Sequence, residues 1–189
     1  MHNQILRQRK EMSSNANGAV RYLTDLRAKD PLMFVAHTVG SDGILKNLFW
    51  CGGESQKNYE VFGDVLAFDA AYKKNKCKCP FVVFSGVNYH NQTINSDIAV
   101  NSNEVEGTYV WLLGQFMVAM KGKPPTSVIT DGDIAMRNAI RRVFPNCYHR
   151  LCVWHLLRNA MSNIGNPDFI PFFKRCMLGD HEVLKFERL

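Results

Sequence analysis

The stretch that decides the fold is VFGDVLAFDAAY, residues 61–72, in which the apolar run VLAF ends in the carboxylate of Asp69. A buried strand that finishes in an acid carries that acid to the edge of a sheet, where metals and substrates can reach it. The pattern recurs downstream, where the short segment SVIT, residues 127–130, is followed by Asp131. We therefore predict that the fold brings these two strand ends side by side.

The composition is that of a globular chain with a basic balance. Of its 189 residues, 46% are apolar and 21% charged, which is enough for one sizeable core. No apolar run is long enough to cross a bilayer, and the N-terminal residues contain no apolar signal core, so we expect neither membrane insertion nor secretion. The six cysteines form no CxxC pair and are expected to be free thiols. The net charge of +6 favours an anionic partner, nucleic acid first, although a mildly basic protein without such a partner has the same balance.

The first part of the chain is predicted to comprise an arm and a hairpin. Residues 1–30 are polar and basic and include a short helix that ends before Pro31. Residues 31–60 are predicted to form a β-hairpin lead-in, and the polar residues 51–60 would cap the next element. The strands of the hairpin are expected at residues 33–39 and 44–50.

Residues 61–189 are predicted to form the main domain, truncated at its C-terminal end. Strands are expected at residues 65–70, 80–87, 92–100, 127–130 and 147–153. Helices are expected at residues 108–121, 133–144, 154–163 and 169–189. The strand at 92–100 has one polar face, which is typical of an edge strand. Three antiparallel-connected strands followed by alternating strands and helices predict an α/β fold with a mixed sheet and helices on both faces.

Asp69 and Asp131 are the first candidates for chemistry. If their strands are parallel neighbours, the two carboxylates lie close together and supply hard oxygen ligands for Mg²⁺ or Mn²⁺. Such a pair supports phosphoryl transfer by two metal ions. The alternative is that both acids are turn or capping residues, with Asp131 capping the helix at 133–144 and Asp133 favoured in its first turn by the helix dipole.

Basic side chains follow both acids and could bind a nucleic-acid backbone. Equally, they could be a solvated hairpin and a solvated helix face. The candidates are Lys73, Lys74, Lys76, Arg137 and Arg141.

The stretch CYHRLCVWH, residues 147–155, contains two cysteines and two histidines. A single zinc site with all four ligands conflicts with strand geometry, because Cys147 and His149 would face away from Cys152. Cys152 and His155 remain a plausible pair across a strand-to-helix turn. The alternative is a buried cysteine and a hydrogen-bonded histidine.

Several long segments occur together in a familiar order and cover residues 30–189. They resemble the Mutator-like (MULE) transposase domain, in the version found in the plant FAR-RED IMPAIRED RESPONSE family of transposase-derived transcription regulators. The segments are DPLMFVAHTVGSDGILKNLFW, FGDVLAFDAAYKKNK, PFVVFSGVNYHNQT, TYVWLLGQFMVAMKGKPPTSVITDGDIAMRNAI and RRVFPNCYHRLCVWHLLRNA.

The resemblance implies a ribonuclease-H-like fold with a DDE-type metal site that would take Mg²⁺ or Mn²⁺. Asp69 would be the first acid and Asp131 the second, and Glu187, in the segment KFERL, would be the third. Cys152 and His155 would be the CxxH pair of the family, with zinc as its metal.

The resemblance also implies a nuclear, DNA-associated regulator that forms homo- or heterodimers and whose catalytic-like domain no longer transposes DNA. The alternative is an active DDE-type transposase domain. Departures from the family pattern include Ala71 in place of a threonine, Cys77 in place of an aromatic residue, and the polar interruption at residues 95–97. The zinc-type DNA-binding and SWIM modules of full-length members do not occur in this sequence, so we expect a fragment.

Overall fold

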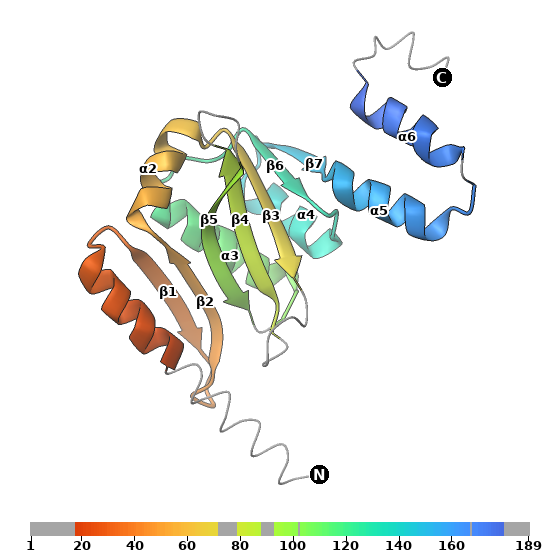
Figure 1. Ribbon diagram of the computed structural model, residues 1–189. Helices are drawn as coiled ribbons and strands as arrows, with labels where there is room; N and C mark the ends of the chain where they lie inside the picture. The colour runs from red at the N-terminus through yellow and green to blue at the C-terminus, as the bar shows by residue number, and fades with distance from the viewer. Residues whose placement is uncertain (1–17, 72–78, 88–92, 102, 167, 180–189) are drawn as a thin grey trace, which may run out of the picture. The chain divides into compact units, whose positions relative to one another are not determined.

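The computed structural model describes residues 18–71, 79–87, 93–101, 103–166 and 168–179 (Figure 1). The contacts between residues divide the chain into two compact units, Met1–His149 and Arg150–Leu189. The first unit carries most of the sheet and its core, and the second carries a pair of helices.

A mixed sheet forms the framework of the first unit. Its order within the described residues is β1-β2-β5-β4-β3-β6-β7. The bounds are β1 Phe34–Val39, β2 Leu45–Cys51, β3 Val65–Ala71, β4 Phe81–Val87, β5 Thr93–Asn101, β6 Ser127–Thr130 and β7 Tyr148–Leu151. In this sheet order, each neighbouring pair from β1 to β3 is antiparallel: β1–β2, β2–β5, β5–β4 and β4–β3. β6 pairs with β3 in parallel. This topology confirms the predicted α/β fold with its ribonuclease-H-like sheet.

The prediction that the third strand lies at a sheet edge is wrong. β5 pairs with β4 on one side and with β2 on the other, where Leu48 lies opposite Val100 and Trp50 opposite Ile98. The N-terminal hairpin therefore extends the sheet beyond β5 and satisfies its backbone hydrogen bonds. Alternation of apolar and polar residues indicates which face of a strand is exposed to solvent. It does not indicate whether a strand from a distant part of the chain pairs with its edge.

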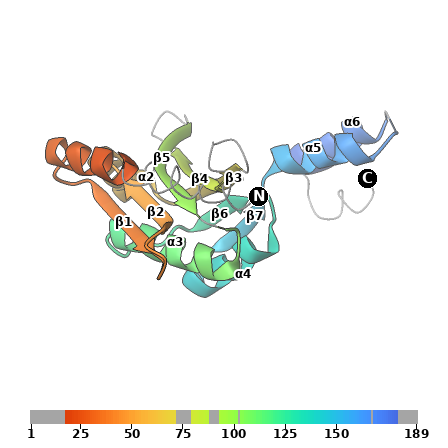
Figure 2. The same ribbon diagram turned by 90° about the horizontal axis from the view of Figure 1, so that it is seen from below.

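Helices cover both faces of the sheet, as predicted. Alternate residues of β2 face opposite ways: Phe49 is buried in the main core, and Leu48 is buried against the helix of residues 18–29. Figure 2 shows that helix and α3 on opposite sides of the β1–β2 hairpin. The labelled helices of this unit are α2 Gly53–Phe62, α3 Glu106–Ala119 and α4 Ile134–Val143.

Aromatic rings fill the main core between the sheet and α3. Phe84 of β4 stacks on Phe116 of α3 with ring centroids 5.1 Å apart, and Phe49 meets Phe84 edge-on at 6.0 Å. Tyr59 of α2 approaches Phe116 edge-on at 5.0 Å. Offset and edge-to-face arrangements of this kind are favoured by the ring quadrupoles in addition to the apolar area that they bury.

Helix α2 replaces the polar cap that was predicted for residues 51–60. Its sequence lacks an apolar stripe, and Tyr59 is its one large buried side chain in the described structure. The backbone N–H of Gly53 donates to Asp30 Oδ2 at 2.7 Å, so a residue remote in sequence satisfies the start of the helix. This helix therefore depends on tertiary contacts, and the local pattern of apolar residues does not predict it.

The second unit contains α5 Val153–Asn163 and α6 Phe169–Leu178. The two helices contact each other, and Phe169 stacks on Phe173 within α6 with ring centroids 5.4 Å apart. Ala160 is the one buried residue among those described in this unit. In the described residues of both units, no helix combines the length and apolar character needed to span a membrane.

Candidate functional site

The two predicted acids lie at matching positions of neighbouring strands. β3 and β6 pair in parallel, with Val65 opposite Ser127 and Ala67 opposite Ile129. Two residues further in the chain direction are Asp69, inside β3, and Asp131, directly after β6, and neighbouring strands lie about 4.8 Å apart. The strand ends therefore meet at one edge of the sheet, while the role of the two carboxylates as metal ligands stays a prediction.

The register of this pair is fixed at the opposite end of the strands. The backbone N–H groups of Thr126 and Ser127 both donate to the carbonyl oxygen of Asp64, each at 2.9 Å. Asp64 immediately precedes β3, and Ser127 is the first residue of β6. The two strands therefore begin in a fixed register, and that register continues toward the acids at their far ends.

Two further carboxylates face the same region. The phenol of Tyr109, which is 1% exposed on α3, has a pKa raised by burial first and then by the charges of Glu104, Asp133, Asp131 and Asp69. The pKa of Glu104 is itself raised by burial and then by Asp133 and Asp131. Four acids therefore act electrostatically on one buried phenol. Nothing in the sequence pattern marks Glu104, because it lies in the irregular segment before α3.

The oxygen atoms of the two aspartates are of the type that hard divalent cations bind. Carboxylate oxygens at Asp69 and Asp131 are the ligands that Mg²⁺ and Mn²⁺ prefer, with water completing the coordination. Within the described ranges, no three or more His, Cys, Asp or Glu side chains are grouped closely enough to hold an ion. Glu187, the predicted third acid, lies outside the described residues, as do Lys73, Lys74 and Lys76.

Backbone hydrogen bonds shape the loop that carries the second acid. The N–H of Asp133 donates to Asp131 Oδ1 at 3.1 Å, and the N–H of Met136 donates to Asp133 Oδ1 at 2.9 Å. Asp133 is therefore the N-cap of α4, and the alternative in which Asp131 caps this helix is wrong. Gly132 between them has φ +95°, a left-handed conformation that glycine adopts without strain.

Thr130 connects this loop to β7. Its Oγ1 accepts a hydrogen bond from the N–H of Gly132 at 3.2 Å and lies 2.8 Å from Nε2 of His149. Burial, then the charges of Arg137 and Arg141, lower the pKa of His149. His149 is therefore a half-buried, hydrogen-bonded histidine whose ring is held by Thr130.

Neighbouring Cys147 shows the same lack of metal-ligand character. It is half-buried, and burial raises the pKa of its thiol. The thiolate is the form that binds zinc, so this environment disfavours ligation at Cys147. The prediction that Cys147, His149, Cys152 and His155 do not form one four-ligand zinc site stays a prediction.

Arginines lie on the helix next to the acid-bearing loop. Arg137 of α4 is half-buried and Arg141, one turn further, is exposed. Both act electrostatically on His149, which places them near β7. The predicted basic stripe is thus close to the Asp131 loop, and its contact with nucleic acid stays a prediction.

The predicted zinc pair lies in the second unit. Cys152 is the N-cap residue of α5, and His155 is in the first turn of the same helix. Cys152 has an extended backbone and lies just outside the helix, so the two residues are close in the chain without sharing a helical face. A structural zinc site needs four ligands, and the described residues contribute this pair only, so zinc binding stays a prediction.

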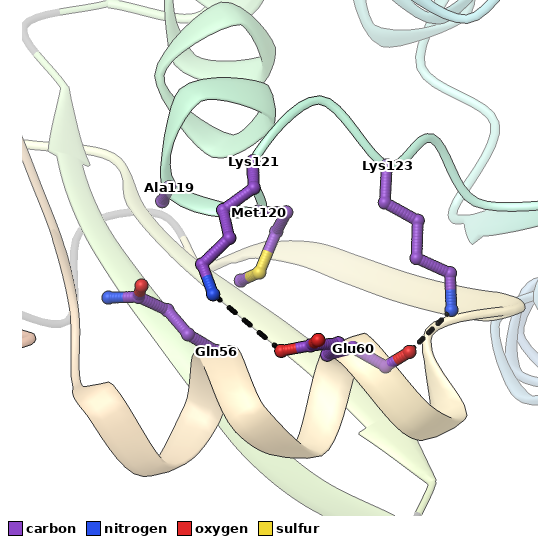
Figure 3. A pocket seen from close by; sticks show the side chains of 6 residues that line it. All are labelled: Gln56, Glu60, Ala119, Met120, Lys121 and Lys123. Atoms are coloured by element: carbon purple, nitrogen blue, oxygen red, sulfur yellow. Dashed lines mark hydrogen bonds and ion pairs between the residues drawn. The ribbon is translucent and has the colours of Figure 1, made fainter.

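A small cavity of about 130 Å³ lies away from the acids, between α2 and the end of α3 (Figure 3). Lys121 Nζ lies 3.6 Å from Glu60 Oε2, and Lys123 Nζ donates to the backbone oxygen of Glu60 at 2.9 Å. These helix ends lead into β3 and β6, so the cavity is at the sheet edge opposite Asp69 and Asp131. Its lysines hold two helix C-termini together, which is a structural role.

The fold and the paired strand ends define an α/β domain of the ribonuclease-H-like class with an acidic sheet edge. Residues 65–159, about half of the chain, match the MULE transposase domain. The chain belongs to this family, as the resemblance of its segments predicted.

Curated relatives extend the match over most of the chain. Protein FAR1-RELATED SEQUENCE 5 of Arabidopsis thaliana is 35% identical over 172 residues, covering 88% of this chain and 22% of the relative. Protein FAR-RED IMPAIRED RESPONSE 1 of the same plant is 34% identical over 163 residues, covering 84% of this chain and 20% of the relative. The chain therefore spans about a fifth of the length of these relatives.

The catalytic core domain of BIV integrase is a weaker structural neighbour. It is 6% identical, covers 65% of this chain and 88% of its own, and superposes with a TM-score of 0.32. An overlap this low carries no argument about function. The fold assignment rests instead on the strand order and directions described above.

Proposed function

We propose that this chain is the DNA-associated, transposase-derived domain of a nuclear transcription regulator, with an acidic sheet edge inherited from a nuclease-like ancestor that no longer cuts DNA. Membership of the MULE family and similarity to FAR-RED IMPAIRED RESPONSE 1 support the class. The observation that carries DNA association is the position of Arg137 and Arg141 beside the loop of Asp131. Homo- or heterodimers with similar chains are part of this proposal.

The electrostatics favour a polyanion along α4. Arginine side chains on an exposed helix face contact phosphate oxygens and fix the register of a duplex without reading its sequence. The net charge of +6 adds attraction at longer range. Binding of this kind weakens steeply with salt, because each neutralised phosphate releases condensed counterions.

The test is fluorescence anisotropy of the full chain with a short duplex at several salt concentrations. Replacing Arg137 and Arg141 by glutamine should weaken binding and reduce the slope of log affinity against log salt by about 2, roughly 1 for each lost phosphate contact. A double variant with Lys29→Gln and Lys57→Gln is the charge-matched control, because both lysines are exposed on helices away from α4. An unchanged slope in the arginine double variant would remove α4 from the interface.

Nuclear localisation has a separate test. A fluorescent fusion of the intact parent protein in plant cells should accumulate in the nucleus, and a cytoplasmic distribution would contradict a role in transcription. Dimerisation is measured by the molar mass in solution as concentration is raised. A monomer throughout would remove the dimer from the proposal.

An active DDE-type nuclease is the second candidate, and the matched register of Asp69 and Asp131 favours it. Two carboxylates at one sheet edge are the minimum for metal-assisted hydrolysis of a phosphodiester. The intact parent protein with Mn²⁺ would then nick DNA that contains its own element ends, and Asp69→Asn or Asp131→Asn would abolish the nicks. If the unmutated protein makes no nicks, the result supports the first proposal, a transcription regulator that no longer cuts DNA.

A further inference from the structure

The contact between His149 and Thr130 links two elements around the candidate site. Thr130 ends β6 and is 1% exposed, and His149 lies on β7. Thr130 Oγ1 is 2.8 Å from His149 Nε2 and accepts from the N–H of Gly132 at 3.2 Å. A single buried hydroxyl therefore connects the imidazole to the residue that follows Asp131.

The number of donors and acceptors decides which way the protons point. A threonine hydroxyl has one proton to donate and two lone pairs. Gly132 occupies one lone pair, so the hydroxyl proton needs an acceptor, and a buried hydroxyl without one is unfavourable. Nε2 of a neutral imidazole is an acceptor when Nδ1 carries the proton. If Nε2 donated instead, the Thr130 proton would have no acceptor among the contacts of the described structure.

We propose that His149 is a positioning residue for Asp131: as the Nδ1–H tautomer it accepts the hydroxyl proton of Thr130 and thereby fixes the loop of Asp131, Gly132 and Asp133. Thr130 acts as the relay, because its orientation toward His149 aims its free lone pair at the N–H of Gly132. The charged groups known to act on the imidazole are Arg137 and Arg141 of α4, and both oppose an imidazolium there.

The consequence for function concerns the carboxylate of Asp131. Its Oδ1 already accepts the N–H of Asp133 within the same loop, so loop position and carboxylate orientation are coupled. Partners that orient a metal ligand typically change metal affinity by about 10–100-fold when removed. This consequence rests on the proposed metal-site ancestry, whereas the positioning itself does not.

The positioning is tested on the metal-free full chain. Long-range proton–nitrogen NMR spectra should show the proton of His149 on Nδ1, and a proton on Nε2 would overturn the proposal. In His149→Phe, which lacks an acceptor, the amide of Gly132 should exchange with solvent roughly fivefold faster, the ratio expected for one net hydrogen bond. In His149→Gln, whose side-chain oxygen can reach the position of Nε2, exchange should return close to the wild-type rate.

Two further variants separate positioning from general destabilisation. Thr130→Val, which removes the relay hydroxyl, should behave like His149→Phe, and Thr130→Ser should behave like the wild type. Ile140→Val in the core of α4 should lower overall stability by a comparable amount and leave the Gly132 rate unchanged relative to other amides. Equal Gly132 exchange in His149→Phe and the wild type would overturn the role of His149.

Mn²⁺ titration by calorimetry then tests the functional consequence. Affinity should fall about tenfold or more in His149→Phe and recover in His149→Gln. No Mn²⁺ binding by the wild type would contradict the metal site and leave the exchange result as the test of positioning. Equal Mn²⁺ affinity in the wild type and His149→Phe would overturn the effect of His149 on Asp131.

Discussion

The carboxylate of Asp30 accepts a hydrogen bond from the backbone N–H of Gly53 at 2.7 Å, so the residue that follows the helix of 18–29 caps the start of α2. The other carboxylate oxygen accepts the N–H of Leu32 at 3.2 Å. One side chain thus fixes both the turn into β1 and the helix after β2. The N-terminal hairpin is joined to the rest of the first unit through this contact as well as through β5.

Asp30→Ala should destabilise the fold by about 1 kcal/mol, the typical contribution of an N-cap carboxylate. Urea denaturation followed by circular dichroism measures the change. Asp25→Ala is the matched control, because Asp25 is exposed on the preceding helix, and it should change stability little. Equal effects of the two substitutions would contradict a capping role for Asp30.

Gly53→Ala should be destabilising by about 1–3 kcal/mol because there is no room for a methyl group. A Cβ at this position would lie 2.6 Å from Cβ of Leu32 and 2.7 Å from Oδ1 of Asp30. Gly107→Ala is the contrasting control, since a Cβ there meets nothing within 4 Å, and alanine in a helix should stabilise by roughly 0.5–1 kcal/mol. Thermal melts should therefore shift in opposite directions for the two variants.

Stability should rise with pH through the titration of His149. Its pKa in the folded protein lies below the ordinary value of 6.5, so the unfolded chain binds more protons between the two values. The contribution is present in full above pH 6.5 and is lost as pH falls through the folded pKa. Urea midpoints of the wild type and His149→Gln, measured across this window, should differ in slope. Parallel curves would contradict the lowered pKa.

Asp131→Asn should lower the pKa of Glu104. In the wild type, burial and then the negative charges of Asp133 and Asp131 raise the pKa of Glu104. Removing the charge of Asp131 removes one of these causes, so the pKa should fall. Carbon NMR titration of the Glu104 carboxyl measures the change, with Asp25→Asn as the control. An unchanged titration would mean that the acids do not converge at this edge of the sheet.

Local patterns predicted the elements that bury a regular apolar face. The bounds of β6 agree with the prediction residue for residue, because the β-branched pair Val128 and Ile129 follows Pro125 and precedes the turn residues Asp131 and Gly132. The parallel pairing of β3 with β6, on which the closeness of Asp69 and Asp131 depends, is observed, and the metal site itself stays a prediction. α2 was not predicted, because its start depends on Asp30 and its packing on Tyr59.

The environment of the candidate site depends on contacts that no local pattern contains. The sequence made Asp131 the cap candidate and Asp133 an acid of the first turn, whereas Asp133 is the cap because its side chain accepts the N–H of Met136. Glu104 joins the acids through an irregular segment between β5 and α3. The hydrogen bond of His149 was not predicted, because its partner Thr130 lies on another strand.

The double hydrogen bond from Thr126 and Ser127 to the Asp64 carbonyl also determines where the chain tolerates changes of length. Residues inserted before Thr126 would enlarge a surface loop and leave the strands in step. A single residue inserted after it, within β6, would turn every following side chain to the opposite sheet face and carry Asp131 away from Asp69. Natural variation in length is therefore expected on the N-terminal side of Thr126 and excluded on the other.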